Sequence, residues 1–382
     1  MTRATSTNDA CDVIVVGVGA MGSAAAFHLA RRGARVVGID TFAPPHAMGS
    51  SHGRTRIIRE AYFEDPLYVP LVQRAYECWA ELEALTDRKL LVQTGGLMIG
   101  PEDGEVVGGA LKSARQYGLP HEIHTAAEVR RRFPAFEPAG GEVAVWEPRA
   151  GYLIPEDCVD AHLRLARGHG AKFRFDETVL SWRPDGEGVE IVTTRGRLRA
   201  DRVIVTAGAW AGDLLSELRL PLTIERNYLC WFTPRRPTPV FAPDRFPIFI
   251  WEYAPGLSWY GFPDAGDGVK LALHHQGETT RADDVRRTVS DDEIERVRAL
   301  QHQFLPGADG AVRETAVCMY TNTPDQNFII DRHPAHPAIV VASPCSGHGF
   351  KFSSAIGEEL ANIALGQERR FDFSPFRLSR FS

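Results

Sequence analysis

The chain has 382 residues, of which 44% are hydrophobic and 24% charged, and its formal net charge is −6. This composition is typical of a globular protein that is long enough for two domains. The acidic balance gives no basic footprint for nucleic acid, and no apolar run approaches the roughly 18 residues of a membrane span. Residues 2–10 are polar and lack the apolar core of a signal peptide, so we predict a tail there.

The six cysteines are scattered, with no Cys-x-x-Cys pair and no spacing typical of a metal site. They favour a reducing, cytoplasmic setting in which most of them are small buried residues. Of the 43 basic residues, five are lysines: Lys89, Lys112, Lys172, Lys270 and Lys351. Most positive charges in this chain are arginines, so we expect a lysine to be used where its own chemistry is needed. Lysine is a compact charge whose pKa the surroundings can shift, unlike that of arginine.

The first unit predicted along the chain is a strand, a glycine-rich turn and a helix within residues 11–32. The apolar run 12–16 is typical of a buried strand, and it is followed by Gly17-Val18-Gly19-Ala20-Met21-Gly22 and an alanine-rich helix. This G-x-G-x-x-G spacing is the dinucleotide fingerprint in its required context. Gly17 allows the tight turn, Gly19 the approach of a pyrophosphate and Gly22 the contact of helix with strand. The helix N-terminus then faces the phosphates.

A second strand, residues 35–39, leads to Asp40. A carboxylate at this point can accept hydrogen bonds from the hydroxyls of a ribose, whereas it disfavours the 2′-phosphate of NADP. The sequence therefore predicts a site for FAD or NAD. The structural alternative is a glycine-rich turn without a ligand.

The later elements follow from periodicity and turn residues. They are a helix over 66–85, a strand over 92–99, helices over 106–116 and 126–133, a strand over 143–146, a loop at Tyr152, a helix over 155–168, a strand over 172–182 with a hairpin to 189–192, and a buried strand over 200–205 that ends in a small-residue turn at Gly208. Residues 221–317 predict an antiparallel sheet with a helix over 291–304, and residues 338–342 a strand before a glycine-rich turn and a helix to about 365.

This order predicts an α/β protein with two interleaved domains. We expect a discontinuous Rossmann-like FAD-binding domain from residues 1–90, 150–220 and 319–382. An antiparallel-sheet substrate domain is expected from residues 91–149 and 221–318. There is no internal repeat and no low-complexity tract.

Several short motifs follow one another over nearly the whole chain. They are residues 17–22 with Asp40, Pro44-Pro45-His46, Ser51-His52-Gly53 with 55–59, residues 260–263, Lys270-Leu271 with His274, and residues 318–321, 328–331, 346–352 and 375–381. Together they resemble the family of monomeric sarcosine oxidase and N-methyltryptophan oxidase, within the D-amino-acid-oxidase-like flavoenzymes. The resemblance implies FAD attached through its 8α-methyl carbon to Cys318. It also implies a small amino-acid or amine substrate, O₂ and a monomer without nucleic-acid or membrane partners.

The resemblance also implies the roles of single residues. Substrate binding is implied for Arg59, Lys351, Tyr260 and Gly347, since a cation holds the substrate carboxylate. Catalytic roles are implied for Lys270, His274, Tyr260, Arg56 and His52, with Lys270 near flavin N5 where it stabilises superoxide. Cofactor contacts are implied for Gly17, Gly19, Ala20, Met21, Gly22, Asp40, His52, Arg56, Gly208, Cys318, Gly349, Phe350 and Lys351. No metal site is expected.

Each role has a plainer structural alternative. The alternatives are a buried thiol for Cys318, an ion pair with Glu60 or Glu64 for Arg59, a surface cation for Lys351, an exposed strand lysine for Lys270, core packing for Tyr260 and His274, and a hydrogen-bonded loop pair for His52 and Arg56. We expect His275 on the opposite strand face from His274. Gly347 and Gly349 indicate backbone that approaches the ring or the substrate, whereas for His348 itself a structural hydrogen bond is an open alternative and no site role is predicted.

Two residues and one turn depart from the family pattern. Ser51 stands where a His is usual, Arg54 stands where an Asp is usual, and the turn between Pro263 and Lys270 is one residue shorter. We expect these changes near the substrate entrance, with cavity walls from the regions of Tyr260 and Trp251, so the substrate stays open.

The implied reaction is oxidation of a secondary amino acid such as sarcosine. Hydride passes from the N-methyl group to flavin N5, the imine hydrolyses to formaldehyde and a primary amino acid, and O₂ reoxidises the flavin to give hydrogen peroxide. Alternatives are an oxidase or dehydrogenase of N-methyltryptophan, of pipecolate or proline, or of another amine, a nicotinamide dehydrogenase, or a non-catalytic binding module. A binding module would need none of Lys270, Cys318 and Lys351.

Overall fold

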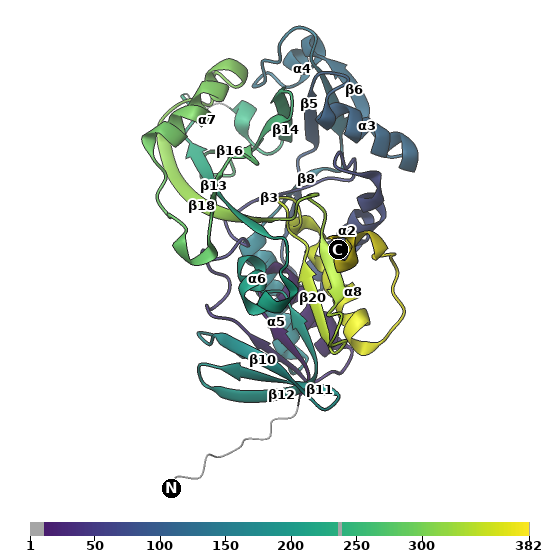
Figure 1. Cartoon of the computed structure of the whole chain (residues 1–382). Coiled ribbons are helices and arrows are strands. Elements are labelled where there is room, and N and C mark those ends of the chain that lie inside the picture. The colour runs from purple at the N-terminus through teal and green to yellow at the C-terminus, as the bar shows by residue number, and fades with distance from the viewer. Residues whose placement is uncertain (1–10, 236–238, 382) are drawn as a thin grey trace.

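The structure is a computed structural model that describes residues 11–235 and 239–381. The predicted tail at residues 2–10 lies outside the described residues. Two large sheets and one small sheet, with helices packed around them, form the protein (Figure 1). Within the described ranges, no helix is both long and apolar enough to cross a membrane.

The first sheet carries the glycine-rich turn. Its strands, in spatial order, are β10 (Val179–Asp185), β11 (Gly188–Thr193), β12 (Gly196–Val205), β1 (Cys11–Val16), β2 (Val36–Ile39) and β9 (Lys172–Arg174), with β20 (Ile339–Ser343) beside β12 and β19 (Ile329–Arg332) beside β20. The pairings among β9, β2, β1, β12 and β20 are parallel. Strands buried on both faces are near-continuous apolar runs, as the sequence of β1 shows.

Helices on this sheet fix the position of the glycine-rich turn. They are α1 (Ala20–Arg31), α2 (Val69–Thr86), α5 (Pro155–Gly168), α8 (Ser353–Leu365) and the short α6 (Ala211–Leu214). Helix α1 contacts both α5 and α8, and its alanines are buried. A Cβ on Gly357 of α8 would overlap Ala24 of α1, so a glycine is needed at this contact. The N-terminus of α1 is thereby held at the end of β1.

The second sheet has the spatial order β17 (Glu278–Thr280), β13 (Thr223–Phe232), β16 (Val269–His274), β15 (Leu257–Phe262), β14 (Ile248–Ala254), β5 (Gly96–Gly100), β7 (Val143–Glu147) and β6 (Glu122–Thr125), with β18 (Val312–Asn322) beside β13. Its helices are α3 (Glu105–Tyr117), α4 (Ala126–Arg132) and α7 (Asp291–Phe304). All pairs are antiparallel except β5 with β14. Figure 1 shows the long strands β13 and β18 side by side.

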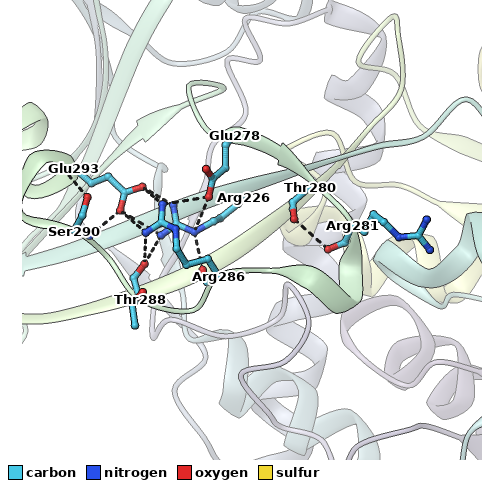
Figure 2. Close-up of polar contacts among 8 residues, drawn as sticks. All are labelled: Arg226, Glu278, Thr280, Arg281, Arg286, Thr288, Ser290 and Glu293. Atoms are coloured by element: carbon cyan, nitrogen blue, oxygen red, sulfur yellow. Dashed lines mark hydrogen bonds and ion pairs between the residues drawn. The ribbon is translucent and has the colours of Figure 1, made fainter.

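A buried arginine joins α7 to this sheet (Figure 2). Arg226 of β13 is 1% exposed, and it donates to Glu293 of α7 at 2.6 Å and to the carbonyl of Thr288 at 2.6 Å. Arg286 adds an ion pair to Glu278 of β17 at 3.2 Å. Paired and hydrogen-bonded in this way, the buried guanidinium fixes the start of α7 against β13.

The predicted α/β class with an interleaved second sheet is confirmed, and three local expectations are wrong. The predicted strand 92–99 is two strands in different sheets, β4 (Leu91–Gln93) and β5, because the chain turns at Gly95 with φ +71°. The predicted strand 172–182 is also two strands, β9 and β10, which lie at opposite ends of the strand order of the first sheet and are separated by Asp176 at φ +53°. Tyr152 lies in β8 (Gly151–Leu153), between β4 and β3 (Arg56–Ile58) in the small sheet, instead of in a loop.

Candidate active site

One cavity extends from the glycine-rich turn of the first sheet to the second sheet. Fifteen of the predicted site residues line it: Gly17, Gly19, Ala20, Met21, Asp40, Arg56, Arg59, Gly208, Tyr260, His274, Cys318, Gly347, Gly349, Phe350 and Lys351. Gly22, His52 and Lys270 are buried but do not line it. The structure therefore brings together residues that lie more than 300 positions apart in the sequence.

Main-chain atoms build one end of the cavity, which we call the nucleotide end. Gly17 has φ +82°, and a Cβ there would lie 2.6 Å from the carbonyl oxygen of Thr206 at the end of β12. A Cβ on Gly22 would overlap the carbonyl of Gly17. Asp40 accepts a hydrogen bond from the N–H of Val18 at 2.8 Å, which holds its carboxylate beside the turn.

Ser51 also lies at the nucleotide end. Its hydroxyl accepts a hydrogen bond from the N–H of Ala20, the first residue of α1, at 3.1 Å. A Cβ on Gly19 would lie 3.2 Å from the same oxygen. The expectation that Ser51 lies near the substrate entrance is wrong, because the loop after β2 returns to the N-terminus of α1.

Side chains build the other end, which we call the reaction end. Cys318 of β18 lies there, with its sulfur 3.3 Å from Nη2 of Arg56, which also donates to the carbonyl of Ser50 at 2.9 Å. Burial and the charge of Arg56 lower the pKa of His52 to about 3, so this imidazole is neutral. Its Nε2 has no hydrogen-bond partner among the described residues.

Arg59 is 1% exposed, and its guanidinium lies 4.3 Å from the ring centres of both Tyr62 and Phe63. It donates to Glu64 at 2.5 Å, while its Nε has no partner in the described part of the chain. Burial alone would raise the pKa of Glu64, but the charge of Arg59 outweighs it and the pKa falls to about 2. The predicted alternative of an ion pair with Glu64 is therefore present, and both partners line the cavity.

Lys351 and Arg59 both contact Tyr62. Its ammonium donates to the carbonyl of His348 at 2.7 Å and to the hydroxyl of Tyr62 at 3.3 Å. Nε2 of His348 lies 3.0 Å from the carbonyl of Gln326, which can only accept, so Nε2 carries the hydrogen. Nδ1 then accepts a hydrogen bond from the hydroxyl of Tyr62 at 2.6 Å. Burial and the charge of Arg59 lower the pKa of Lys351 to about 7. His348 thus forms two hydrogen bonds within the fold, and it also lines the cavity.

Tyr320 contacts two predicted site residues, but the sequence analysis did not predict Tyr320 as a site residue. Its hydroxyl lies 3.3 Å from both the hydroxyl of Tyr260 and Nδ1 of His274. The signal was its place two residues after Cys318 in a strand, which puts both side chains on one face. Burial, aided by His275, lowers the pKa of His274 well below its ordinary value. His275 is not on the opposite face, because its φ of +53° brings its ring centre within 4.2 Å of that of His274.

Lys270 is 2% exposed and lies among acceptors from the loop after β2. Its ammonium donates to the carbonyls of Gly53 at 2.7 Å and Thr55 at 2.9 Å, and to the Thr55 hydroxyl at 3.0 Å. Burial and the charge of Arg56 lower the pKa of Lys270 well below its ordinary value. The three acceptors around this nitrogen, two of them carbonyls, oppose this shift because hydrogen bonds to the charged form favour it.

The cavity wall expected from the region of Trp251 is formed by the residue before it in β14. Trp251 is fully buried in the aromatic core of the second sheet, with its ring centre 4.5 Å from that of Phe304, and its neighbour Ile250 lines the cavity. Alternation along β14 puts these two side chains on opposite faces. The described residues contain no group of three or more side chains that could hold a metal ion.

The first sheet is parallel at its centre and carries a glycine-rich turn, and one cavity runs from this turn to a group of buried cations. These features are typical of a dinucleotide-dependent oxidoreductase. The sequence matches the family described as FAD dependent oxidoreductase over residues 12–363. The chain belongs to this family and is an FAD-dependent enzyme.

Individual proteins agree with this assignment. The chain is 46% identical over 358 residues to a monomeric sarcosine oxidase of Streptomyces avermitilis, covering 93% of each protein. It is 37% identical over 374 residues to an N-methyl-L-tryptophan oxidase of Salmonella dublin, covering 97% of this chain and 99% of that protein. NikD, a solved amino acid oxidase of nikkomycin biosynthesis, has a TM-score of 0.84 at 23% identity over 96% of this chain and 97% of its own. This last similarity shows the shared fold.

The residues of the cavity fit FAD. At the nucleotide end the backbone at Gly17 and Gly19 is free of side chains, and the N-terminus of α1 offers N–H groups to a pyrophosphate. At the reaction end Arg56 and Lys351 supply positive charge, which suits a flavin that becomes negative on reduction.

Proposed function

We propose that this enzyme oxidises a secondary, N-methyl amino acid, most simply sarcosine, at its N-methyl group. The observation that carries the proposal is the pair of buried cations, Arg59 and Lys351, on the wall of one cavity. Two buried cations suit a small carboxylate. The names of the two relatives support an N-methyl amino acid. In the overall reaction, sarcosine, water and O₂ give glycine, formaldehyde and hydrogen peroxide.

The side chains at the reaction end bind the substrate and prepare its nitrogen. Arg59 offers the carboxylate its Nε–H, which has no partner among the described residues, and Lys351 adds a second positive charge. The amine has to lose its proton, because an ammonium nitrogen has no lone pair to assist oxidation. The neutral imidazole of His274, with Gly347 and the hydroxyl of Tyr260, provides polar groups without a competing positive charge.

When bound, FAD accepts two electrons from the substrate and delivers them to O₂. Residues 17–22, Asp40 and Gly208 would hold its dinucleotide part. His52, Arg56, Gly349 and Phe350 would surround its ring. Lys270, as a buried ammonium, would stabilise the negative charge that develops on O₂.

We also propose that Cys318 holds FAD through a thioether, with the guanidinium of Arg56, 3.3 Å from its sulfur, fixing the position of the side chain. The test is the colour of acid-precipitated, washed protein. The wild-type pellet stays yellow, and Cys318→Ser releases the flavin into the supernatant. Cys345, which also lines the cavity, provides the matched control, and Cys345→Ser keeps the colour in the pellet. A colourless pellet from flavin-loaded wild type contradicts the thioether.

The substrate is tested with a panel of amines read by peroxide and formaldehyde release. We expect sarcosine to give the highest kcat/KM, ahead of N-methyl-L-tryptophan, L-pipecolate, L-proline and glycine, with one formaldehyde per peroxide. Peroxide without formaldehyde, from a cyclic imino acid used in preference to every N-methyl compound, contradicts the proposal. Substrate consumption without peroxide identifies a dehydrogenase instead.

We further propose that the enzyme works as a monomer in the cytoplasm. All six cysteines lie within the described residues and none of them forms a disulfide, which suits a reducing compartment. The name of the Streptomyces relative supports the monomer. Light scattering of the purified holoenzyme is expected to give the mass of one chain, and a dimer mass contradicts it.

A further inference from the structure

The turn at residues 53–55 is built around the buried ammonium of Lys270. Gly53 has φ +96° and Arg54 has φ +66°, so two successive residues are left-handed. The carbonyls on either side of Arg54, those of Gly53 and Thr55, both reach the same ammonium. Because the left-handed region is sterically disfavoured for arginine, other contacts have to hold the turn in this shape.

The side chain of Arg54 supplies such contacts on the outer side of the turn. It forms an ion pair with Asp267 at 3.0 Å and another with Glu314. Asp267 lies in the turn before β16, and Glu314 lies on β18. Arg54 therefore ties the turn to the second sheet at two points.

The two ion pairs meet on the face of the sheet that carries Lys270. Trp231 of β13 is paired with Lys270 of β16 on one side and with Glu314 of β18 on the other. Directly paired residues point to the same face, so these three side chains form one row. The Arg54 guanidinium lies 5.1 Å and the Lys270 ammonium 5.4 Å from the same Trp231 ring.

The first sheet holds the turn from the other side. Glu156, in the first turn of α5, accepts hydrogen bonds from the N–H groups of Gly53 at 2.7 Å and Arg54 at 3.1 Å. The main chain is thus fixed by Glu156 and the side chain by Asp267 and Glu314. With the side chain of Arg54 removed, the turn keeps its main-chain hydrogen bonds to Glu156 but loses both ion pairs to the second sheet.

We propose that Arg54 is a positioning residue for Lys270: its two ion pairs fix the carbonyls that bind the ammonium. This inference rests on the proposed role of Lys270 toward O₂. It also joins two departures from the family pattern, because Arg54 pairs with Asp267 in the shortened turn between Pro263 and Lys270. The arginine and the shortened turn then act as one unit that holds the oxygen-side lysine.

The first test uses chemical labelling of lysines and needs no substrate. Native holoenzyme is treated with an amine-acetylating reagent, and the five lysines are followed by peptide mass spectrometry. In wild type, exposed Lys89 reacts while Lys270 and Lys351 are protected. Arg54→Ala should raise the acetylation rate of Lys270 at least about fivefold, because its local structure opens more often, and leave Lys351 protected. The control variant Arg281→Ala removes an exposed ion pair with Asp284 and should leave Lys270 and Lys351 protected from acetylation.

The second test separates the two half-reactions by stopped flow. Arg54→Ala should slow reoxidation by O₂ by about three- to tenfold, the effect of losing interactions at one group, and leave anaerobic reduction by substrate unchanged. The double variant with Lys270→Met should be no slower than Lys270→Met alone. Enzyme reduced with dithionite gives the same reoxidation rate without any substrate, so a wrong substrate assignment does not disturb this result.

The outcomes are distinct. The proposal is supported if Lys270 is labelled faster and if reoxidation is slower while reduction by substrate is unchanged. Unchanged protection of Lys270, equal slowing of both half-reactions, or additive effects in the double variant overturn it. Should Arg54→Ala fail to fold, Glu314→Gln removes the charge of one ion-pair partner and should change both readouts in the same direction by a smaller factor.

Discussion

The two ends of the cavity are built by different means. At the nucleotide end, the groups that face the cavity are mainly backbone, and glycines are needed because Cβ atoms at Gly17 and Gly22 would overlap neighbouring main chain. At the reaction end, the groups are side chains from β3, β15, β16, β18 and the turn before α8. A backbone site is therefore lost by adding atoms, whereas a side-chain site is lost by removing them.

The largest effect is expected where an atom is added at the nucleotide end. Gly22→Ala puts a Cβ into the carbonyl of Gly17 and 2.7 Å from the Thr206 hydroxyl, so β1 and α1 must separate. We expect a loss of at least about 3 kcal/mol in the free energy of unfolding, and protein without bound flavin. Gly212→Ala, where no atom lies within 4 Å, should stay within about 0.5 kcal/mol of wild type and stay yellow.

At the reaction end, removing charge should cost nearly as much. Arg59→Gln leaves the half-buried Glu64 without its partner, and we expect a loss of about 3 kcal/mol in the free energy of unfolding, measured with denaturant. The double variant with Glu64→Gln should recover much of this stability but still bind substrate weakly. Equal stability of the single and double variants would mean that the ion pair does not hold this wall.

The same ion pair gives a pH dependence of defined sign. The pKa of Glu64 is lowered from 4.5 to about 2, so its contribution is complete above pH 4.5 and is lost as the pH falls toward 2. Between pH 5 and 2 the wild type should lose on the order of 3 kcal/mol more stability than Glu64→Gln.

Lys351 should make carboxylate binding depend on pH in the opposite range. Its pKa of about 7 means that the charge is present below pH 7 and lost above it. We expect the Kd of an unreactive carboxylate such as acetate, followed by flavin absorbance, to rise about tenfold between pH 7 and 9. Lys351→Arg stays charged throughout and should show a flat Kd. A flat Kd in wild type would mean that Arg59 alone binds the carboxylate.

The same comparison explains what could be predicted from the sequence. The nucleotide end was predictable because its glycine spacing and the acid after the second strand are local patterns, as in residues 17–22 and Asp40. At the reaction end, strand alternation was enough to find Tyr320 from Cys318. It failed at His275, where a single left-handed residue reverses the direction of the ring. The sequence predicted a wall in the region of Trp251 but not which face of β14 meets the cavity, because that depends on tertiary packing.

The smallest effect is expected where a side chain contributes to the nucleotide end. Helix α1 has Gly19 at its N-cap and no side-chain cap of its own, so the Ser51 hydroxyl serves the N–H of Ala20 from a distant loop. Ser51→Ala should cost about 1 kcal/mol in the free energy of unfolding, the usual cost of a lost cap, and leave the protein yellow. Ser181→Ala, on the exposed surface of β10, should be neutral in the same unfolding measurement. If Ser51→Ala instead abolished flavin binding, a side chain would control the end of the cavity that we attribute to backbone, and the contrast between the two ends would not hold.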